Sequence, residues 1–406
     1  MRASTLFRAA GVAVLPALAA CGGDARAAGP VVRDSAGVEI VENGAPAWKQ
    51  GQEWRLSAEP ALDVGMLDGP TQYQFGDVAG VVRLGDGTLV VGDDQSKDLR
   101  FFDRAGRHVR SVGREGGGPG EFKAVGNLFS LEDTLVVGDW SSRRVSVFAP
   151  DGRFIRAIPL ESKEFTFPAG YFRGGALLLR AGTTFDSGSK SGLTRDSITY
   201  LRLDPAGGPP KKLGRFPGPE SWVQTNGGGI MVTSPAFGRS SKLAAVPDGF
   251  FFGSADAHEI RRYDAAGRLV RLIRRREALR PVTPADIDRY KQMLRKDAEE
   301  SKEPFIRQML ERSLAEMPFP ETMPAHGDLR VDRAGNLWVS DFQLTGEDAG
   351  RWTVFDPQGR MLGAVATPPR FQVHDIGTDY VAGVWKDELD VEHVRVFSLE
   401  KAGADR

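Results

Sequence analysis

Short apolar runs alternate with polar turns along most of this chain, and the alternation restarts at regular intervals. One complete cycle lies between residues 78 and 112. Its apolar runs are 78–84, 88–92, 99–103 and 108–112, separated by a Gly-Asp-Gly turn, a polar stretch and an Ala-Gly turn. Glycine allows the positive φ of a tight hairpin, so the cycle predicts four antiparallel strands.

The third run of the cycle ends in a phrase close to Val-Phe-Asp-x-x-Gly-Arg. Copies of this phrase begin at Leu99, Val145, Ile198, Ile260, Trp352 and Val394. The second run can be matched at 88–92, 134–138, 176–180, 249–253, 336–340 and 380–384. A repeat of about 40–50 residues with four strands is typical of a propeller blade. A β-sandwich has no reason to repeat one phrase, so we predict an all-β, six-bladed β-propeller with four-stranded antiparallel blades.

Two regions depart from the repeat. The last copy lacks a fourth strand, and residues 53–58 could supply it. An N-terminal strand that closes the last blade would leave no free sheet edge. Between blades four and five, residues 283–317 have a helical pattern that begins with a cap at Thr283 and a proline after it. We predict a helical hairpin there, which either packs on the blades or serves as a lid or docking surface.

The long connections are expected on one face of the propeller, because strands run alternately up and down. They are 113–122, 181–197, 216–238, 342–351 and 385–393, together with the helical insertion. Function collects on long loops held by a rigid scaffold, so we place the binding face there. A phenylalanine precedes five predicted first strands, and these residues are expected to pack between blades: Phe75, Phe122, Phe167, Phe237 and Phe371.

The link Gly113-Arg-Glu-Gly-Gly-Gly-Pro-Gly-Glu-Phe122, followed by Asp139 and Arg144, resembles NHL-type repeats. In that family an Asp ends the second strand and an Arg precedes the third. Asp93 and Asp341 match the Asp, whereas Asp98 and Glu259 occupy the Arg position in blades one and four. The resemblance covers roughly residues 52–403. It implies a propeller and leaves the activity open, because such propellers host many functions.

The N-terminus has two arginines, a short apolar stretch and then Leu18-Ala-Ala-Cys21. Leu-Ala-Ala-Cys resembles a bacterial lipobox, in which the cysteine is acylated and becomes the first residue. Acyl chains would anchor the protein to a bacterial membrane. We therefore predict a lipoprotein signal peptide at 1–20, an acylated Cys21 with a tether and extension at 21–51, and the propeller at 52–406. Gly22 and Gly23 favour an exported protein anchored at the outer membrane, on its periplasmic or surface face.

Charge narrows the range of partners. Removal of residues 1–20 would leave 51 basic and 54 acidic residues, a net charge of −3. A nucleic-acid-binding protein would carry a basic groove with stacking aromatics, so we expect no nucleic-acid partner.

Two sets of side chains are candidates for chemistry. His258, His326 and His374 occur in consecutive blades and could together hold a divalent metal such as Ca or Zn, as the resemblance to NHL-type lyases allows. A lone histidine is otherwise a surface or packed residue. The second set follows second strands on the predicted binding face and could bind a protein, saccharide or peptide ligand: Asp93, Asp139, Trp140, Asp341, Phe342 and Trp385. Turn capping by the carboxylates and packing by the rings explain them as well.

These features favour an exported lipoprotein whose propeller binds a ligand or a protein through its loop-rich face. The alternative is a metal-dependent lyase or lactonase-like hydrolase with its active site at the propeller axis. A third possibility is a structural envelope component that associates through the helical hairpin.

Overall fold

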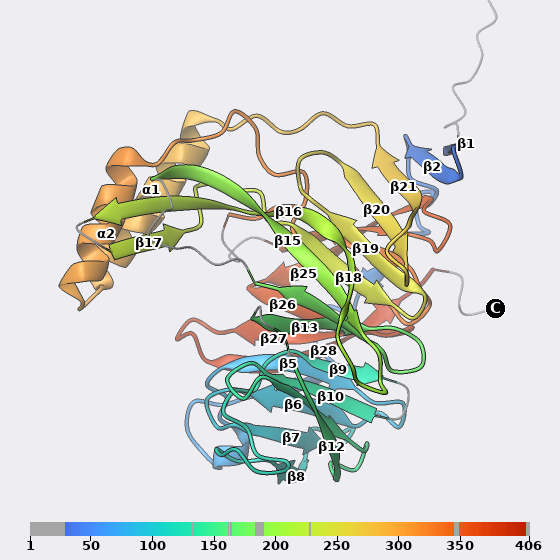
Figure 1. The fold of residues 1–406 in the computed structure, drawn as a ribbon, viewed down its shortest axis with the longest axis vertical. Coiled ribbons are helices and arrows are strands. Elements are labelled where there is room, and N and C mark those ends of the chain that lie inside the picture. Colours follow the sequence, from blue (N-terminus) through green and yellow to red (C-terminus); the bar gives the residue numbers. More distant parts are fainter. Residues whose placement is uncertain are drawn as a thin grey trace, which may run out of the picture.

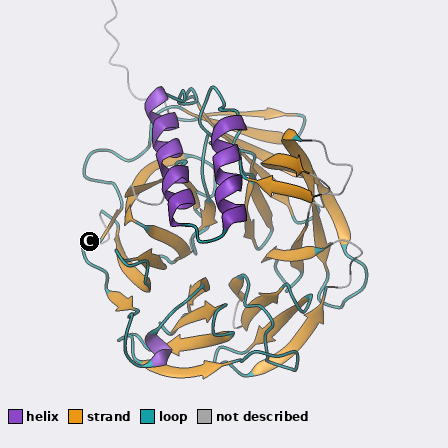
Figure 2. Ribbon diagram, turned by 90° about the vertical axis from the view of Figure 1, so that its left-hand side faces the viewer, coloured by secondary structure: helices purple, strands orange, loops and turns teal. Residues whose placement is uncertain are grey.

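The computed structural model describes residues 29–402, except 132–133, 161, 163–164, 183–190, 227–228 and 345–348. Within these residues the strands form six separate sheets, in which most strands that follow one another in sequence are antiparallel neighbours. The sheets surround a common centre (Figure 2). The arrangement is that of a β-propeller-like protein. Cys21 and the predicted signal peptide lie outside the described residues.

The bounds of the strands follow the sequence repeat. The first two sheets are β5 (Val78–Arg83), β6 (Leu89–Asp93), β7 (Asp98–Phe102) and β8 (His108–Val112), then β9 (Leu128–Leu131), β10 (Thr134–Asp139), β11 (Arg144–Phe148) and β12 (Phe154–Pro159). The third sheet contains β13 (Thr166–Tyr171), β14 (Leu177–Ala181), β15 (Gly192–Leu203), β16 (Lys211–Asn226) and β17 (Gly229–Thr233).

The remaining three sheets complete the set. The fourth contains β18 (Lys242–Val246), β19 (Gly249–Gly253), β20 (Glu259–Asp264) and β21 (Leu269–Arg275). The fifth contains β22 (Leu329–Val331), β23 (Leu337–Ser340), β24 (Ala349–Phe355) and β25 (Met361–Pro369). The sixth contains β26 (Phe371–Ile376), β27 (Tyr380–Lys386) and β28 (Glu392–Glu400) with β3 (Arg55–Leu56), and β4 (Leu62–Val64) also pairs with β28.

Apolar cores lie between neighbouring sheets and close the ring. Val81 and Leu89 of the first sheet pack with Tyr380 and Val394 of the sixth, and five similar clusters join the other neighbouring pairs. The closing strand predicted at 53–58 is present as β3, which pairs with β28 through Leu56 and Leu399. The first and last parts of the chain therefore hold one sheet together.

One N-terminal hairpin was not expected. β1 (Val31–Ser35) and β2 (Val38–Asn43) extend the fourth sheet, and β2 pairs with β21 in the parallel direction. Asn43, which is buried, donates to the carbonyl of Gly359 and accepts from the amide of Met361. The hairpin thus ties the fourth sheet to the fifth, so part of the predicted tether and extension is structured.

Two long connections were predicted wrongly. Residues 181–197 and 216–238 were expected to be loops, but β15 and β16 run far beyond the end of β14 and, with β17, form an arm (Figure 1). The helices α1 (Pro284–Glu300) and α2 (Pro304–Glu316) lie between β21 and β22 in sequence and pack against this arm. Thr283 caps α1 as predicted, in a reciprocal capping box with Asp286. None of the helices in the described part of the chain is both long and apolar enough to cross a membrane.

Candidate functional site

A pocket of about 530 Å³ opens where the first sheet meets the sixth. Its walls come from three stretches that are far apart in sequence: the link before β5, the β6–β7 loop with the start of β7, and the β27–β28 loop. The lining residues are Met66, Leu67, Thr71, Gln74, Phe75, Asp93, Gln95, Ser96, Arg100, Leu389, Asp390 and Val391. The two loops and the link belong to the face on which the sequence placed the binding region.

The short helix η1 (Thr71–Tyr73) shapes the link. The amide of Gln74 donates to the carbonyl of Thr71, which closes the turn, and the amide of Met66 donates to the carbonyl of Tyr73. The Tyr73 hydroxyl accepts from the amide of His108 in β8, which ties the turn to its own sheet. The link is therefore a fixed wall of the pocket.

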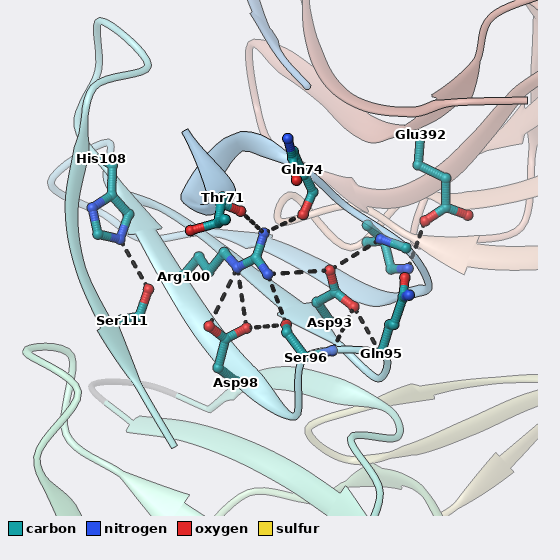
Figure 3. Close-up of polar contacts among 12 residues, drawn as sticks. Thr71, Gln74, Asp93, Gln95, Ser96, Asp98, Arg100, His108, Ser111 and Glu392 are labelled. Carbon is teal, nitrogen blue, oxygen red and sulfur yellow. Dashed lines mark hydrogen bonds and ion pairs between the residues drawn. The ribbon is translucent and has the colours of Figure 1, made fainter. Parts of the chain in front are cut away.

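Arg100 forms the floor of the pocket and holds these segments together (Figure 3). Its Nη1 donates to the carbonyls of Thr71 and Gln74 at 3.2 and 2.5 Å. Its Nη2 donates to Ser96 Oγ at 2.8 Å, and its Nε donates to Asp98 at 3.1 Å. The guanidinium also lies 5.3 Å from the centre of the Phe75 ring. Only 6% of the Arg100 side chain is exposed, and the hydrogen bonds above satisfy its donors within the protein.

Asp93 supplies the second half of this network. Its carboxylate accepts from the amides of Gly76, Gln95 and Ser96 and lies 3.6 Å from Arg100. These contacts join the second strand of the sheet to the link before the first strand. Asp93 was predicted to bind ligand; it does line the pocket, but its oxygens are already used within the protein.

Several polar groups of the pocket are not used in this way. The amide of Gln74 donates from Nε2 to the carbonyl of Gly69, which leaves Oε1 without a hydrogen bond among the described residues. No hydrogen bond of the Gln95 carboxamide is found within the described chain either, and this carboxamide lies directly against Gly76. Leu67 and Leu389 form an apolar rim and are 59% and 72% exposed. The site thus combines a rigid ionic floor, free amide groups and an apolar edge.

Carboxylates gather on the other side of the same link. Glu392 accepts from the amide of Val78 and pairs with Lys386. Asp94 pairs with Lys97 and accepts from the amide of Val125 in the next link. Burial, followed by the nearby charges of Glu392, Asp94 and Asp93, raises the pKa of Asp77.

The other predicted ligand-binding residues do not line this pocket. Asp139 is buried and accepts from the amides of Lys123, Ala124 and Ser142, so it joins strand to link as Asp93 does. Trp140 beside it is 46% exposed. The structure therefore assigns Asp139 to the scaffold and leaves Trp140 as an exposed ring.

The remaining three candidates contact different neighbours. Asp341 pairs with Arg351 at 3.2 Å. Phe342 packs against the apolar cluster of the helices. The Trp385 ring is covered by the guanidinium of Arg395, 3.4 Å from the ring centre.

The three histidines predicted as metal ligands lie in different surroundings. In the described part of the chain no group of three or more His, Cys, Asp or Glu side chains is placed to hold a metal ion. His326 uses both ring nitrogens: Nε2 accepts from the amide of Ala255 and Nδ1 donates to the carbonyl of Gly327. Burial lowers the pKa of His326 to about 4, so the ring is neutral at pH 7.

The other two imidazoles face arginines. His258 Nδ1 accepts from Arg275 at 2.8 Å, and burial together with this guanidinium lowers the pKa of His258. Burial and then the charge of Arg330 lower the pKa of His374 to about 3. A metal ion at either ring would be repelled by the neighbouring positive charge. The described geometry brings no further ligand to these rings, and a metal held by His258, His326 and His374 stays a prediction from the sequence.

Sequence reasoning missed the pocket because Gln74, Gln95 and Leu389 belong to no motif. One feature did point there: Asp98 stands where the repeat has an arginine. Arg100 takes over the arginine's contacts from two residues further along. The departure from the repeat thus marks the site, although it does not say what binds.

No family model matches the chain, and no curated protein matches it. Similar solved structures include a protein of Bacteroides fragilis named as exported, with 12% identity over 89% of this chain and 100% of that chain and a TM-score of 0.47. Virginiamycin B lyase from Staphylococcus aureus has 10% identity over 86% and 100%, with a TM-score of 0.42. The calcium-binding protein regucalcin from Agrobacterium tumefaciens has 9% identity over 86% and 96%, with a TM-score of 0.40.

Proposed function

We propose that this protein is an exported binding protein whose six sheets are the blades of a β-propeller and whose ligand enters the Arg100 pocket. The observation that carries the proposal is the pocket itself. Its volume lies within the range of small-molecule and peptide-segment sites. Binding sites usually combine apolar walls with a few polar groups, and Leu67 and Leu389 supply the first while Gln74 Oε1 and the Gln95 carboxamide supply the second.

The fixed wall and floor support binding for an energetic reason. A preorganised site loses little conformational entropy when a ligand arrives. Arg100, Asp93 and η1 are held by their own hydrogen bonds before any ligand is present. The lyase or lactonase alternative would need convergent His, Asp or Glu side chains, and the imidazoles considered for it are engaged by Ala255 and Arg275.

The proposal can be tested by filling the pocket. Thr71 is exposed and lines it, so Thr71→Trp should occupy the space without disturbing the core. Thr378 is exposed in the β26–β27 turn, outside the pocket lining, and Thr378→Trp is the matched control. Saturation-transfer NMR with a fragment library should detect compounds whose binding falls at least about tenfold in Thr71→Trp and not in Thr378→Trp. Equal binding by both variants, or no binding compound at all, would reject the proposal.

We also propose that Cys21 is acylated and anchors the protein to the envelope. The lipobox-like sequence before it supports this. Expressed in a Gram-negative host, the full chain should partition into the detergent phase of Triton X-114, and Cys21→Ala should partition into the aqueous phase. Intact mass should show the added acyl chains. If both proteins are aqueous and unmodified, there is no lipid anchor.

A further inference from the structure

We infer that the Arg100 pocket takes an uncharged peptide segment with aliphatic side chains. The inference rests on the proposed function, because it names the ligand class of the same pocket. Three properties of the lining lead to it: its charges are already matched, its free polar groups are carboxamides, and its exposed apolar groups are aliphatic.

The charged groups of the pocket are occupied. Arg100 uses Nε on Asp98, both Nη1 hydrogens on backbone carbonyls, and Nη2 on Ser96 and Asp93. Asp93 in turn accepts from three backbone amides. At the rim, Asp390 pairs with Arg370. A ligand carboxylate or ammonium would have to break these bonds in order to pair, and a buried ion pair gives little net gain after desolvation. The lining therefore favours an uncharged ligand.

The free polar groups match a peptide backbone. A glutamine carboxamide presents a donor and an acceptor side by side, which complement the C=O and N–H of one peptide residue. Gln95 has this pair available, and Gln74 adds its Oε1 as a further acceptor. A Cβ on Gly76 would lie 1.2 Å from Gln95 Oε1, so the glycine makes room for the carboxamide in its present position. Gln95 is exposed, and its carboxamide lies at the edge of the cavity.

The apolar groups match aliphatic side chains better than a sugar. Met66, Leu67, Leu389 and Val391 contribute unbranched or branched aliphatic surface to the lining. The aromatic ring of the lining, Phe75, is 8% exposed and has the Arg100 guanidinium over it. An exposed ring face, the usual platform for a saccharide, is therefore missing from the described lining. Leu67 and Leu389 would gain most from contact with a leucine-like side chain, because they are the most exposed.

The test uses acetyl-Leu-Ala-Leu-methylamide as the probe and isothermal titration as the measurement. Gln95→Ala should weaken binding about tenfold, since two hydrogen bonds to the peptide backbone are lost. Gln358→Ala is the matched control, because Gln358 is an exposed glutamine in the β24–β25 turn, away from the pocket; it should bind as the wild type does. The same tripeptide with a free terminal carboxylate should not bind more tightly than the blocked one. An ester in place of the central amide should lose several-fold in affinity, because it removes the N–H donor.

The outcomes separate this inference from the proposed function. Suppose that Thr71→Trp abolishes the binding of other compounds, so that the pocket remains a binding site. The peptide inference is then wrong if the blocked tripeptide does not bind, or if it binds Gln95→Ala as tightly as the wild type. Tighter binding of maltotriose than of the tripeptide would overturn it in the same way. If the tripeptide binds Thr71→Trp unchanged, both the inference and the proposed site are wrong.

Discussion

In both the β5–β8 sheet and the β9–β12 sheet, an arginine of the third strand binds the link that precedes the first strand, but the arginine stands at different positions. In the second sheet, Arg144 begins β11 and donates to the carbonyls of Gly117, Gly118 and Glu121 in the link before β9. In the first sheet, Asp98 begins β7, and Arg100 reaches the carbonyls of Thr71 and Gln74 in the link before β5. In both, a buried aspartate lies beside the arginine, at 3.8 Å in one and 3.6 Å in the other.

The two links differ in what they leave open. The link of the second sheet closes on itself: the amide of Gly116 donates to the carbonyl of Phe122, and Arg114 pairs with Glu121. The link of the first sheet instead turns through η1 and faces the β27–β28 loop across the pocket. Although the arginine is shifted by two residues, its hydrogen bonds still join the link to the strand. The side chains around it in the first sheet line the pocket. The repeat therefore explains the scaffold, and its departure at Asp98 lies beside the candidate site.

The largest expected effect separates the two arginines. Arg100→Met would leave Asp93 and Asp98 without their shared counter-charge, and two backbone carbonyls without a donor. Breaking a buried ion pair from one side costs about 3–5 kcal/mol. Arg144→Met would leave one buried carboxylate, Asp139, and three link carbonyls without this donor. Because Arg144 is more exposed than Arg100 and serves one carboxylate instead of two, its loss should cost about 1–3 kcal/mol. Urea unfolding at pH 7, followed by tryptophan fluorescence, measures both changes.

Arg107→Met provides the control for this pair, because its side chain is 80% exposed and pairs with Asp103 at the surface. Its unfolding midpoint should stay at the wild-type value. If Arg100→Met destabilises the protein no more than Arg144→Met does, pairing with a second carboxylate adds nothing to the free energy of unfolding. The two links would then differ in conformation and not in stability.

A smaller effect is expected from two glycines, Gly113 at the start of the second sheet's link and Gly76 at the end of the first sheet's link. Gly113 has φ +95°, and a Cβ there would lie 2.6 Å from the ring of the buried Phe122. Gly113→Ala should therefore cost about 2–4 kcal/mol, from backbone strain and overpacking. At Gly76 the nearest atoms belong to the side chain of Gln95, whose end can rotate away, so Gly76→Ala should cost about 1 kcal/mol or less.

The two alanine variants should also differ in what they disturb. Gly76→Ala displaces the Gln95 carboxamide, so it should weaken the blocked tripeptide while the thermal midpoint barely moves. Gly113→Ala should lower the midpoint by several degrees and leave the affinity of the folded protein unchanged. Affinity that is insensitive to Gly76→Ala would show that the position of Gln95 does not matter.

Much of the fold could be predicted because the repeat is local. The run predicted at 249–253 is β19 itself, and the run at 88–92 is offset by one residue from β6. The β1–β2 hairpin could not be predicted: β2 pairs in parallel with β21, more than 200 residues away, and local pattern carries no information on such a partner. The β15–β16 arm was hidden because bulges near Arg195 and Pro217 interrupt its alternation.

The site was harder to predict for a physical reason. Carboxylates and imidazoles are easily recognised as candidates in a sequence, yet Asp139 and His326 form their hydrogen bonds with backbone amides of the protein. Phe237 was expected between blades but packs against Tyr290 and Phe319 instead, because the helices cover it. Glutamines such as Gln74 and Gln95 do not stand out in a sequence. They line one pocket because the link before β5 and the β6–β7 loop both pack on Arg100. The contact between the link, the β6–β7 loop and the β27–β28 loop forms because the first and sixth sheets are neighbours, and the sequence of a single repeat does not show this.

The smallest expected effect compares how the two links respond to pH. The pKa of Asp77 is raised, so the folded state holds its proton more tightly than the unfolded chain does, and stability falls as pH rises through that window, from about pH 4 upward. Asp77→Asn should therefore raise the urea midpoint at pH 7 and have little effect below pH 4.

Glu121 has the opposite sign. The Gly118 amide and Arg114 lower its pKa, so its contribution is present above about pH 4.5 and is lost as pH falls through the lowered value. Glu121→Gln should lower the midpoint at pH 7 and matter less near pH 3. Asp77 is exposed and Glu121 is partly exposed, so solvent screening keeps either change well below the effect of Gly113→Ala. Shifts of the same sign for Asp77→Asn and Glu121→Gln at pH 7 would contradict the view that one link gathers excess negative charge while the other neutralises its own.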